Sequence, residues 1–518
     1  MIERREPSRR YSLTLEEFKK VAKEGVVVPI YRTLSSDFDT PVRMFDKLAG
    51  KENKASHFFP SVLLESVTGG ESVGRYSYIC INPKEGIRVT ANDISKLRPD
   101  GIISTERGER IDPLKVIQDE VSKTVVRTPG DPPFSGGYVG YLGYEVVGAF
   151  EDTVPKSKPD PLGVPEAMLF NYDNIIVFDH ARNELKIVGN IDVRDTRDLD
   201  GQYAEALSKI DQTVTRILAP EKIETKSIER KIIQSDIKSN FTNEEYRAAV
   251  QKVIDYLNSG DAIQVVISQR FAKETSASPF AIYRALRRGN PSPYMTYMDF
   301  GDFQIISSSP ELIAQCEDGN ITAHSIAGTR PRGKTEEEDA ALENELKTSE
   351  KQKAEHVMLV DLVRNDMGRI ATVGSVVVEK LMEVVRFSNV MHLASVIKGK
   401  LRSGLTSLDA LRSFFPAGTV SGAPKIRAMQ IIDEIEPEKR GVYSGGIGYI
   451  DHSGNFKMAI GIRTALFKAG AVPDALGTVY AQAGGGIVVD SDPEDERQET
   501  VDKAAAIFRA VKLAEEEY

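Results

Sequence analysis

Three carboxylates in two distant segments of the chain could together hold a divalent cation. Glu355 lies in residues 349–369, SEKQKAEHVMLVDLVRNDMGR, where a helix would place it on one face with Leu359 and Leu362. Glu496 and Glu499, in DSDPEDERQETVDKA, are three residues apart and share a helical face. Mg²⁺ takes such oxygen ligands and shares its coordination sphere with anionic substrates. Acidic clusters also occur at solvated helix starts, where the helix dipole favours them, so both interpretations stay open.

Two glycine-bearing segments could offer backbone N–H groups to an anion. They are residues 324–333, HSIAGTRPRG, and residues 483–488, AGGGIV. Neither has the spacing of a nucleotide-binding loop, and their glycines could equally serve turns. A strand that leads into AGGG nevertheless allows a ligand to approach the backbone closely. The glycine-rich residues 136–144, GGYVGYLGY, lack a phosphate-loop lysine, and we interpret them as structural.

Arg463 stands in KMAIGIRTA, where residues 458–464 predict a strand that otherwise alternates small and apolar residues. An arginine in such a strand is either a neutralised structural charge or a bidentate clamp for a carboxylate. The local sequence does not distinguish these roles.

The composition excludes several kinds of site. The two cysteines, Cys80 and Cys316, are too few for a disulfide framework or a zinc cluster, and the six histidines show no metal-ligand spacing such as HExxH. A net charge of −10 argues against a nucleic-acid surface. No apolar run approaches the roughly 20 residues of a membrane span, and the first residues lack an apolar signal-peptide centre. We therefore expect a cytoplasmic protein that binds neither membrane nor nucleic acid.

The elements that must position these residues fall into two long regions. Residues 1–218 contain strand patterns, such as 86–89 and 174–178, between turn signals. Residues 219–240 are polar and predict a linker, and residues 241–518 form the second region, which starts with a helix at 243–259 and a strand at 262–267. Further helices are predicted at 350–368, 407–415, 425–434 and 496–515, and further strands at 445–450, 458–464 and 478–483.

Several motifs, in this order and at these distances, resemble the chorismate-utilising enzymes: HSIAGTRPRG, AEHVMLVDLVRND, SNVMHL, FPAGTVSGAPK, VYSGGIGYI, AIGIRTA and AGGGIVVDSDPEDERQET. Upstream, LLESVTGGESVGRYSYI and GGYVGYLGYE are similar to the N-terminal region of the anthranilate synthases. The resemblance covers nearly the whole chain. It implies an α+β fold in which two large, mostly antiparallel sheets pack face to face with helices outside, the N-terminal region adding strands to the same core.

The resemblance also separates the branches of the family. Members that activate water carry a lysine at the position of Gln264, and a glutamine cannot serve as that base. Aminodeoxychorismate synthases usually carry a lysine at the position of Ala327. Gln264 and Ala327 therefore favour the anthranilate synthases, which combine chorismate with ammonia, and Ser325 is a small departure from their pattern. Aminodeoxychorismate synthase is the alternative enzyme. A binding or scaffold protein that descends from the family but has lost its activity is the alternative that is not an enzyme.

Roles for individual residues follow from the same resemblance. Glu311 would protonate the departing hydroxyl, and His392 would assist the elimination of pyruvate. Mg²⁺ would be held by Glu355, Glu496 and Glu499. The remaining expected contacts to chorismate and to the reacting atoms are Gln264, Gly328, Thr329, Thr419, Tyr443, Arg463, Gly484, Gly485, Gly486 and Lys503.

Regulation and partners are likewise implied. Ser66, in LLES, and Pro293, Tyr294 and Met295, in NPSPYM, match the two segments that bind inhibitory tryptophan in the family. Strand packing and a turn are the alternative explanations of these segments. The sequence has no GxCxG nucleophile segment of a glutaminase. We therefore expect a separate glutamine amidotransferase subunit that supplies ammonia, in a heterotetramer.

Overall fold

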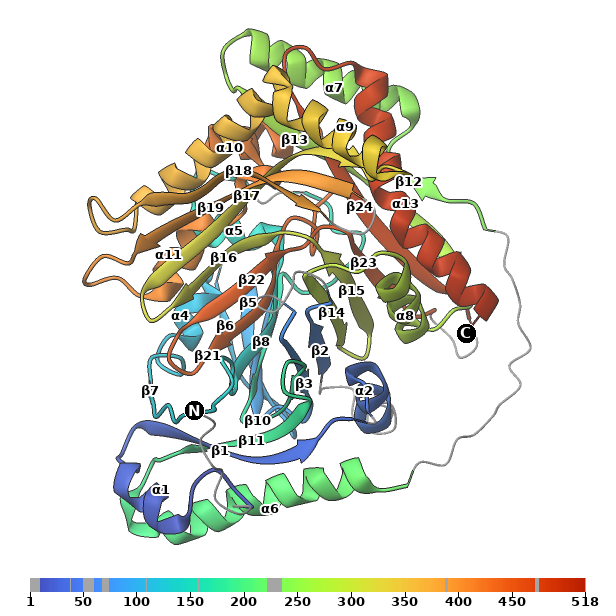
Figure 1. Ribbon diagram of the computed structural model, residues 1–518. Coiled ribbons are helices and arrows are strands. Elements are labelled where there is room, and N and C mark those ends of the chain that lie inside the picture. The colour runs from blue at the N-terminus through green and yellow to red at the C-terminus, as the bar shows by residue number, and fades with distance from the viewer. Residues whose placement is uncertain are drawn as a thin grey trace.

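A computed structural model describes residues 10–37, 39–49, 60–67, 74–108, 110–155, 158–220, 235–386, 390–470 and 475–517. Two large sheets form the body of the protein, and helices cover their outer sides (Figure 1). Residues 221–234 of the predicted linker lie outside the described residues.

The first sheet contains 13 strands, and all of its pairings are antiparallel except that of β1 with β7. In spatial order its strands are β12 (Lys238–Ser239), β13 (Gln264–Thr275), β24 (Gly477–Ile487), β23 (Thr464–Lys468), β15 (Phe303–Ser309), β14 (Tyr294–Asp299), β2 (Ser61–Glu65), β3 (Tyr76–Cys80), β10 (Asn174–Asp179), β11 (Glu184–Asp192), β1 (Val26–Ser35) and β7 (Thr124–Val125), with β20 (Gly422–Ala423) beside β13.

The second sheet contains 11 antiparallel strands. Their order is β18 (Val377–Arg386), β19 (Val390–Lys400), β17 (Asn320–Pro331), β16 (Leu312–Glu317), β22 (Phe456–Ile460), β21 (Gly446–Asp451), β8 (Gly137–Leu142), β9 (Ala167–Tyr172), β4 (Glu85–Val89), β5 (Asp93–Arg98) and β6 (Gly101–Arg107).

The helices are α1 (Leu15–Val21), α2 (Pro41–Ala49), α4 (Pro113–Ile117), α5 (Val147–Phe150), α6 (Leu199–Leu218), α7 (Asn243–Asn258), α8 (Pro279–Gly289), α9 (Glu336–Thr348), α10 (Glu350–Gly368), α11 (Ser407–Phe414), α12 (Lys425–Ile435) and α13 (Pro493–Glu517). Single 3₁₀ turns are η1 (Tyr144–Val146), η2 (Thr196–Asp198) and η3 (Gly418–Val420). In Figure 1, α6 lies below the sheets and α7, α9 and α10 lie above them.

A core of apolar side chains joins the facing sheets. Val62 and Tyr78 from the first sheet and Tyr141 and Phe170 from the second belong to one buried cluster. The rings of Tyr141 and Phe300 meet edge to face with centroids 5.6 Å apart. Burial of each large side chain of this kind contributes about 1.5–3 kcal/mol. The predicted α+β architecture, two mostly antiparallel sheets packed as a sandwich, is confirmed.

Both sheets draw strands from both sides of the predicted linker. In the first sheet, β2 pairs with β14, although more than 200 positions separate them in the sequence. In the second sheet, β8 pairs with β21. The N-terminal region thus contributes strands to the same core, as expected, while the boundary at 219–240 stays a prediction. Gly140, in the glycine-rich β8, leaves no room for a Cβ atom against the Met168 carbonyl of β9, which supports its structural interpretation.

Helix starts follow capping signals in the sequence. At α7 the Thr242 hydroxyl accepts from the Glu245 N–H, while the Glu245 carboxylate accepts from the Thr242 N–H. Ser349 caps α10 through the Gln352 N–H. The predicted helix at 350–368 matches α10 at both ends, and the helices predicted at 243–259, 407–415 and 425–434 match α7, α11 and α12 within one residue.

One predicted strand is wrong. Residues 458–464 do not form a single strand, because β22 ends at Ile460 in the second sheet and β23 begins at Thr464 in the first. The intervening residues cross between the sheets, and Arg463 adopts a left-handed conformation with φ of 51°. This conformation is uncommon for a side chain with a Cβ and recurs at functional sites.

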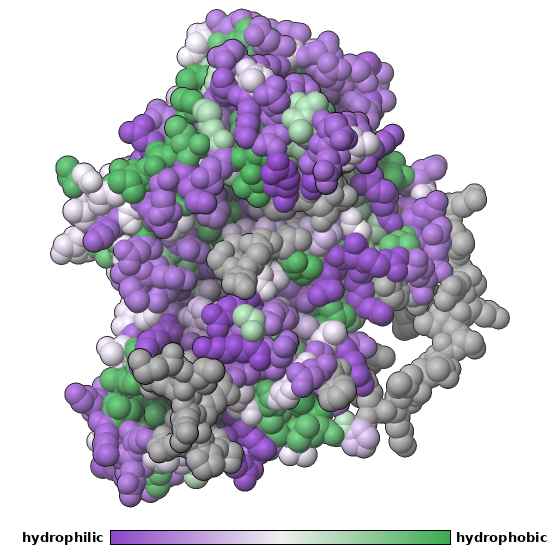
Figure 2. Space-filling view, in the orientation of Figure 1, coloured by the Kyte–Doolittle hydropathy of each residue, from purple (hydrophilic) through white to green (hydrophobic). Residues whose placement is uncertain are grey.

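The face shown in Figure 2 is mainly hydrophilic, with scattered hydrophobic side chains. Exposed apolar residues include Val373, Val377 and Leu381 near or on β18. None of the helices described is both long and apolar enough to cross a membrane. Cys80 and Cys316 are both buried free thiols.

Candidate active site

The three glycines of β24 make room for three polar side chains. Gly484, Gly485 and Gly486 pair with residues 268, 267 and 266 of β13. A Cβ atom on Gly484 would lie 2.8 Å from the Tyr443 hydroxyl. On Gly485 it would lie 2.6 Å from Glu496 Oε2, and on Gly486 2.6 Å from Gln264 Nε2. These distances are too short for real Cβ contacts. The AGGG segment therefore brings together, along one strand, a residue predicted to bind substrate (Tyr443), one predicted to bind the metal (Glu496) and the glutamine that distinguishes the ammonia-using members (Gln264).

Glu496 carries an unused acceptor. Its Oε1 accepts a hydrogen bond from Ser491 Oγ at 2.7 Å, while Oε2 is buried and has no hydrogen-bond partner among the described residues. Burial raises the pKa of Glu496, and the negative charge of Glu499 raises it further. A buried acceptor without a donor is costly, so this oxygen is suited to a positively charged ligand.

Glu355 belongs to the same electrostatic group. It is partly buried on α10, and its pKa is raised by burial and then by the charge of Glu499, with Lys503 and Lys351 opposing. Gln264 interacts with the Glu355 side chain and favours its charged form. The charge of Glu499 thus acts on both Glu355 and Glu496, so the three predicted metal residues interact electrostatically. In the part of the chain that is described, however, no three His, Cys, Asp or Glu side chains are grouped closely enough to hold a metal ion by themselves.

Lys503 and Arg463 form the basic side of the site. Lys503 Nζ lies 2.5 Å from Glu499 Oε1 and donates to the Gly484 carbonyl at 2.8 Å. Arg463 Nη1 donates to the Lys503 carbonyl at 3.0 Å. Burial lowers the pKa of Arg463 from its usual value, whereas the neighbouring Tyr443 and Glu499 oppose this shift. Among the described residues one backbone carbonyl accepts from this guanidinium, which leaves most of its N–H groups available for an anionic ligand.

Glu311 lies between β15 and β16 and is buried, with an exposed fraction of 7%. Burial raises its pKa to about 8, although the nearby Thr419 hydroxyl and the Lys503 charge favour ionisation. Glu311 and Thr419 line one small hollow together with Leu359 and Leu362 of α10. The structure therefore joins the predicted acid to the helix that carries Glu355, and the carboxyl of Glu311 holds a proton at neutral pH.

His392 is oriented by a bulge in the neighbouring strand. β17 pairs with β19 through Ala327 and Leu393 and then through Thr329 and His392. Gly328 therefore bulges out of the strand and has no residue opposite it in β19. The Gly328 carbonyl lies 2.9 Å from His392 Nδ1, and the Thr329 hydroxyl lies 3.1 Å from the same nitrogen. Because a carbonyl only accepts, Nδ1 carries the hydrogen and Nε2 the lone pair. Burial lowers the pKa of His392 and keeps the ring neutral.

The four residues predicted for tryptophan binding are brought together. Ser66 follows β2, whose Glu65 pairs with Met295 of β14. Tyr294 and Pro293 precede Met295 in the chain. The Ser66 hydroxyl is buried and has no hydrogen-bond partner among the described residues. Burial and the charge of Glu311 raise the pKa of Tyr294 to about 12, so this cluster adjoins the predicted acid.

Some residues of the site were not found from the sequence. Ser491 holds one oxygen of Glu496, and the charge of Lys351 acts on both Glu355 and Glu496. Arg440 and Glu436 lie buried behind Tyr443. A serine in an acidic turn and a lysine near a helix start are common, so neither residue type carries a distinguishing signal.

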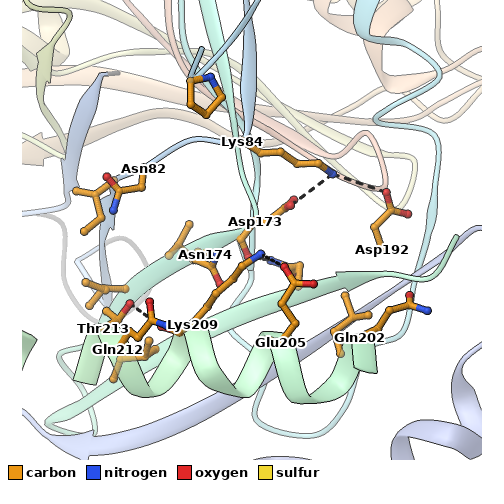
Figure 3. Close-up of a pocket in the computed structure, with 18 of the residues that line it drawn as sticks. Asn82, Lys84, Asp173, Asn174, Asp192, Gln202, Glu205, Lys209, Gln212 and Thr213 are labelled. Atoms are coloured by element: carbon orange, nitrogen blue, oxygen red, sulfur yellow. Dashed lines mark hydrogen bonds and ion pairs between the residues drawn. The ribbon is translucent and has the colours of Figure 1, made fainter. Parts of the chain in front are cut away.

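A separate hollow of about 600 Å³ lies between α6 and the first sheet (Figure 3). Its charged groups pair with one another: Lys84 lies 3.5 Å from Asp173, and Lys209 lies 2.7 Å from Glu205. None of the described residues that line this hollow is among those predicted for the site. The catalytic candidates therefore lie elsewhere, around β24, α10 and α13.

Comparison with known proteins agrees with this arrangement. The model of the chorismate binding enzyme family matches residues 60–509. Anthranilate synthase component 1 of Aquifex aeolicus is 43% identical over 506 residues, which cover 98% of this chain and 99% of the relative. The same component of Pseudomonas aeruginosa is 43% identical, with 97% and 99% covered.

Solved structures show the same fold. Anthranilate synthase component I of Streptococcus pneumoniae has a TM-score of 0.73 at 36% identity and covers 92% of this chain and 98% of its own. The menaquinone-specific isochorismate synthase of Escherichia coli has a TM-score of 0.66 at 17% identity over 94% of each chain, which shows a shared fold alone. By its family match, its relatives and its architecture, the chain belongs to the chorismate-binding enzymes, in the anthranilate synthase component 1 family.

Proposed function

We propose that this enzyme converts chorismate and ammonia into anthranilate and pyruvate, the first dedicated step of tryptophan biosynthesis, with Mg²⁺ as its cofactor. The proposal depends mainly on the buried position of Glu311, whose pKa is raised to about 8 and which shares one site with Lys503 and the three carboxylates. Such a group serves as a general acid toward an anionic substrate. Gln264, beside Gly486 and Glu355, leaves the site without the lysine of the water-activating members.

In the first step ammonia adds at ring C2 of chorismate while the C4 hydroxyl leaves as water. Glu311 donates the proton that this hydroxyl requires. Its raised pKa of about 8 keeps the proton available at neutral pH. The Lys503 charge and the Thr419 hydroxyl, which both favour the ionised form, stabilise the carboxylate once the proton has been transferred.

In the second step the C2 proton is removed, the enolpyruvyl group leaves as pyruvate after taking up a proton, and the ring becomes aromatic. His392 accepts the C2 proton at Nε2. The Gly328 carbonyl fixes the required tautomer by accepting from Nδ1–H. The lowered pKa of His392 keeps this nitrogen unprotonated, so that its lone pair is free to accept the proton.

Chorismate carries two carboxylates, and the site offers two places for them. Arg463 and the Tyr443 hydroxyl bind the enolpyruvyl carboxylate through donated hydrogen bonds. Glu355, Glu496 and Glu499 would hold Mg²⁺, whose positive charge would offset the repulsion between this acidic site and the ring carboxylate. The unpartnered Oε2 of Glu496 fits this role. Because the described residues contain no group of three such side chains close enough to hold a metal ion by themselves, a substrate carboxylate would have to contribute to the binding of Mg²⁺.

Ammonia comes from glutamine through a separate amidotransferase subunit, which we propose assembles with this chain into a cytoplasmic heterotetramer. Its relatives are named component 1, which agrees with a second component. Tryptophan inhibits by binding beside Ser66, Pro293, Tyr294 and Met295. Such inhibition requires that tryptophan bind one conformation better than the other.

The test is to incubate the purified chain with chorismate, Mg²⁺ and either ammonium or glutamine. Anthranilate and pyruvate from ammonium, none from glutamine, and loss of both products with a chelator are expected. Aminodeoxychorismate as the product would instead support the alternative, aminodeoxychorismate synthase, against which Ala327 argues. Isochorismate would overturn the role given to Gln264, and glutamine use by the chain alone would overturn the need for a partner.

A further inference from the structure

Arg440 is a buried guanidinium, 2% exposed, whose five N–H groups all have acceptors. Nε and Nη2 donate to the two oxygens of Glu436 at 2.9 and 2.6 Å. Nη2 also donates to the Val266 carbonyl at 2.7 Å. Nη1 donates to the Val420 carbonyl at 2.7 Å and to Ser444 Oγ at 3.2 Å. The fork of donors therefore contacts three separate segments besides Glu436.

Glu436 extends the same network. Its Oε1 accepts from the Ser268 N–H at 2.7 Å and from Ser268 Oγ at 2.8 Å. Its side chain is 4% exposed and that of Arg440 is 1% exposed, so the pair is screened from water. Removal of one partner from such a pair leaves a buried charge without compensation.

Each segment that Arg440 contacts carries a residue of the proposed active site. Val420 follows Thr419, and Ser444 follows Tyr443. Ser444 has a φ of 64°, a left-handed conformation that the bond from Arg440 helps to hold. The Arg440 Cζ atom also lies 5.5 Å from the centre of the Tyr443 ring.

The third contact reaches β13. Val266 and Ser268 of this strand pair with Gly486 and Gly484, and the strand begins at Gln264. The guanidinium thus links the strand of the ammonia-branch glutamine to the turns that carry the hydroxyls of Thr419 and Tyr443.

We propose that Arg440, held by Glu436, is a positioning residue that fixes Tyr443, Thr419 and the start of β13 relative to one another. This inference rests on the proposed function. Small displacements of groups that bind or protonate a substrate lower rates steeply. A lysine has three donors at one point and cannot reach the Glu436 carboxylate and three separate segments together.

The experiment compares Arg440→Lys with the matched control Arg75→Lys. Arg75 makes a similar two-pronged pair with the buried Asp179, far from β24 along the first sheet. For Arg440→Lys we expect the KM for chorismate to rise and kcat to fall, each about tenfold. Partial unfolding lowers the apparent kcat alone, because unfolded protein contributes no turnover. A raised KM therefore separates positioning from loss of folded enzyme.

A second variant covers the case in which Arg440→Lys does not fold. Ser444→Ala removes one acceptor of Arg440, and with it the hydrogen bond between the Ser444 and Tyr443 side chains, without leaving a charge unpaired. We expect a several-fold higher KM for chorismate with little change in Tm. Unchanged KM and kcat in a folded Arg440→Lys, or unchanged KM in Ser444→Ala when the lysine variant is unfolded, would overturn the proposal. Wild-type protein is assayed first, since its failure to form anthranilate would refute the proposed function instead.

Discussion

The carboxylate of Glu496 occupies the space in which a Cβ atom on Gly485 would lie, with Oε2 2.6 Å from that position. Gly485→Ala must therefore displace Glu496, the residue whose Oε2 we assign to Mg²⁺. We expect the Mg²⁺ concentration for half-maximal activity to rise about tenfold or more, while kcat at saturating Mg²⁺ falls less. Titration of activity with Mg²⁺ measures both.

The control for this variant is Gly368→Ala at the exposed end of α10, where an added Cβ meets no atom within 4 Å. Its Mg²⁺ requirement should equal that of the wild type. An unchanged requirement in Gly485→Ala would remove Glu496 from the metal site.

Glu311 gives the enzyme two pH signatures. Its carboxyl has a pKa of about 8 in the folded protein, against an ordinary value of 4.5. As a general acid it must be protonated, so kcat/KM falls as the pH rises through about 8. Stability also falls between pH 4.5 and 8, because the unfolded chain releases this proton before the folded one does. Glu311→Gln cannot ionise and should lose activity with ammonia at every pH.

Thermal unfolding tests the stability signature. The Tm of Glu311→Gln relative to the wild type should rise from pH 5 to pH 9. The exposed Glu205→Gln on α6 serves as the control and should show no such rise, because the hydrogen bond and positive charge of Lys209 lower the pKa of Glu205 below its ordinary value. A Tm difference for Glu311→Gln that does not change with pH would contradict a protonated, buried carboxyl.

Local sequence patterns predicted the limits of helices and strands better than they predicted which strands pair with one another. The helix at 350–368 was predicted from its apolar spacing, a signal that lies within the segment itself. The sandwich came from the family resemblance, because periodicity cannot specify that β2 pairs with β14. The predicted strand at 458–464 failed because an apolar run does not reveal that its middle residues cross from one sheet to the other.

The same limit holds for the site. Glu311 meets Thr419 and Lys503 only after distant segments fold together, and its raised pKa depends on that burial. The role of Arg440 could not be foreseen, since a charged residue in EPEKRG is typical of an exposed turn. Its burial depends on five hydrogen-bond acceptors, which the folded chain supplies from Glu436, Val266, Val420 and Ser444.

His392 should be needed for the second step alone. His392→Asn keeps a donor for the Gly328 carbonyl but has no basic nitrogen. The aminated intermediate should therefore accumulate while anthranilate formation falls about 10²–10⁴-fold. Mass spectrometry of the reaction mixture distinguishes the two products. His180→Asn, at a histidine bonded to Ser77, is the control and should form anthranilate normally. Equal loss of both products in His392→Asn would assign His392 to the first step.

The last prediction concerns the buried hydroxyl of Ser66, which has no partner among the described residues. Ser66→Ala removes an unsatisfied polar group, so the unliganded protein should be as stable as the wild type or more stable. If tryptophan uses this hydroxyl, the concentration for half-maximal inhibition should nevertheless rise, while kcat stays unchanged. Ser77→Ala provides the opposite control, since Ser77 Oγ bonds His180 at 2.8 Å. Its loss should cost about 1 kcal/mol of stability and leave inhibition intact. Unaltered inhibition in Ser66→Ala would show that tryptophan binds elsewhere or without this hydroxyl.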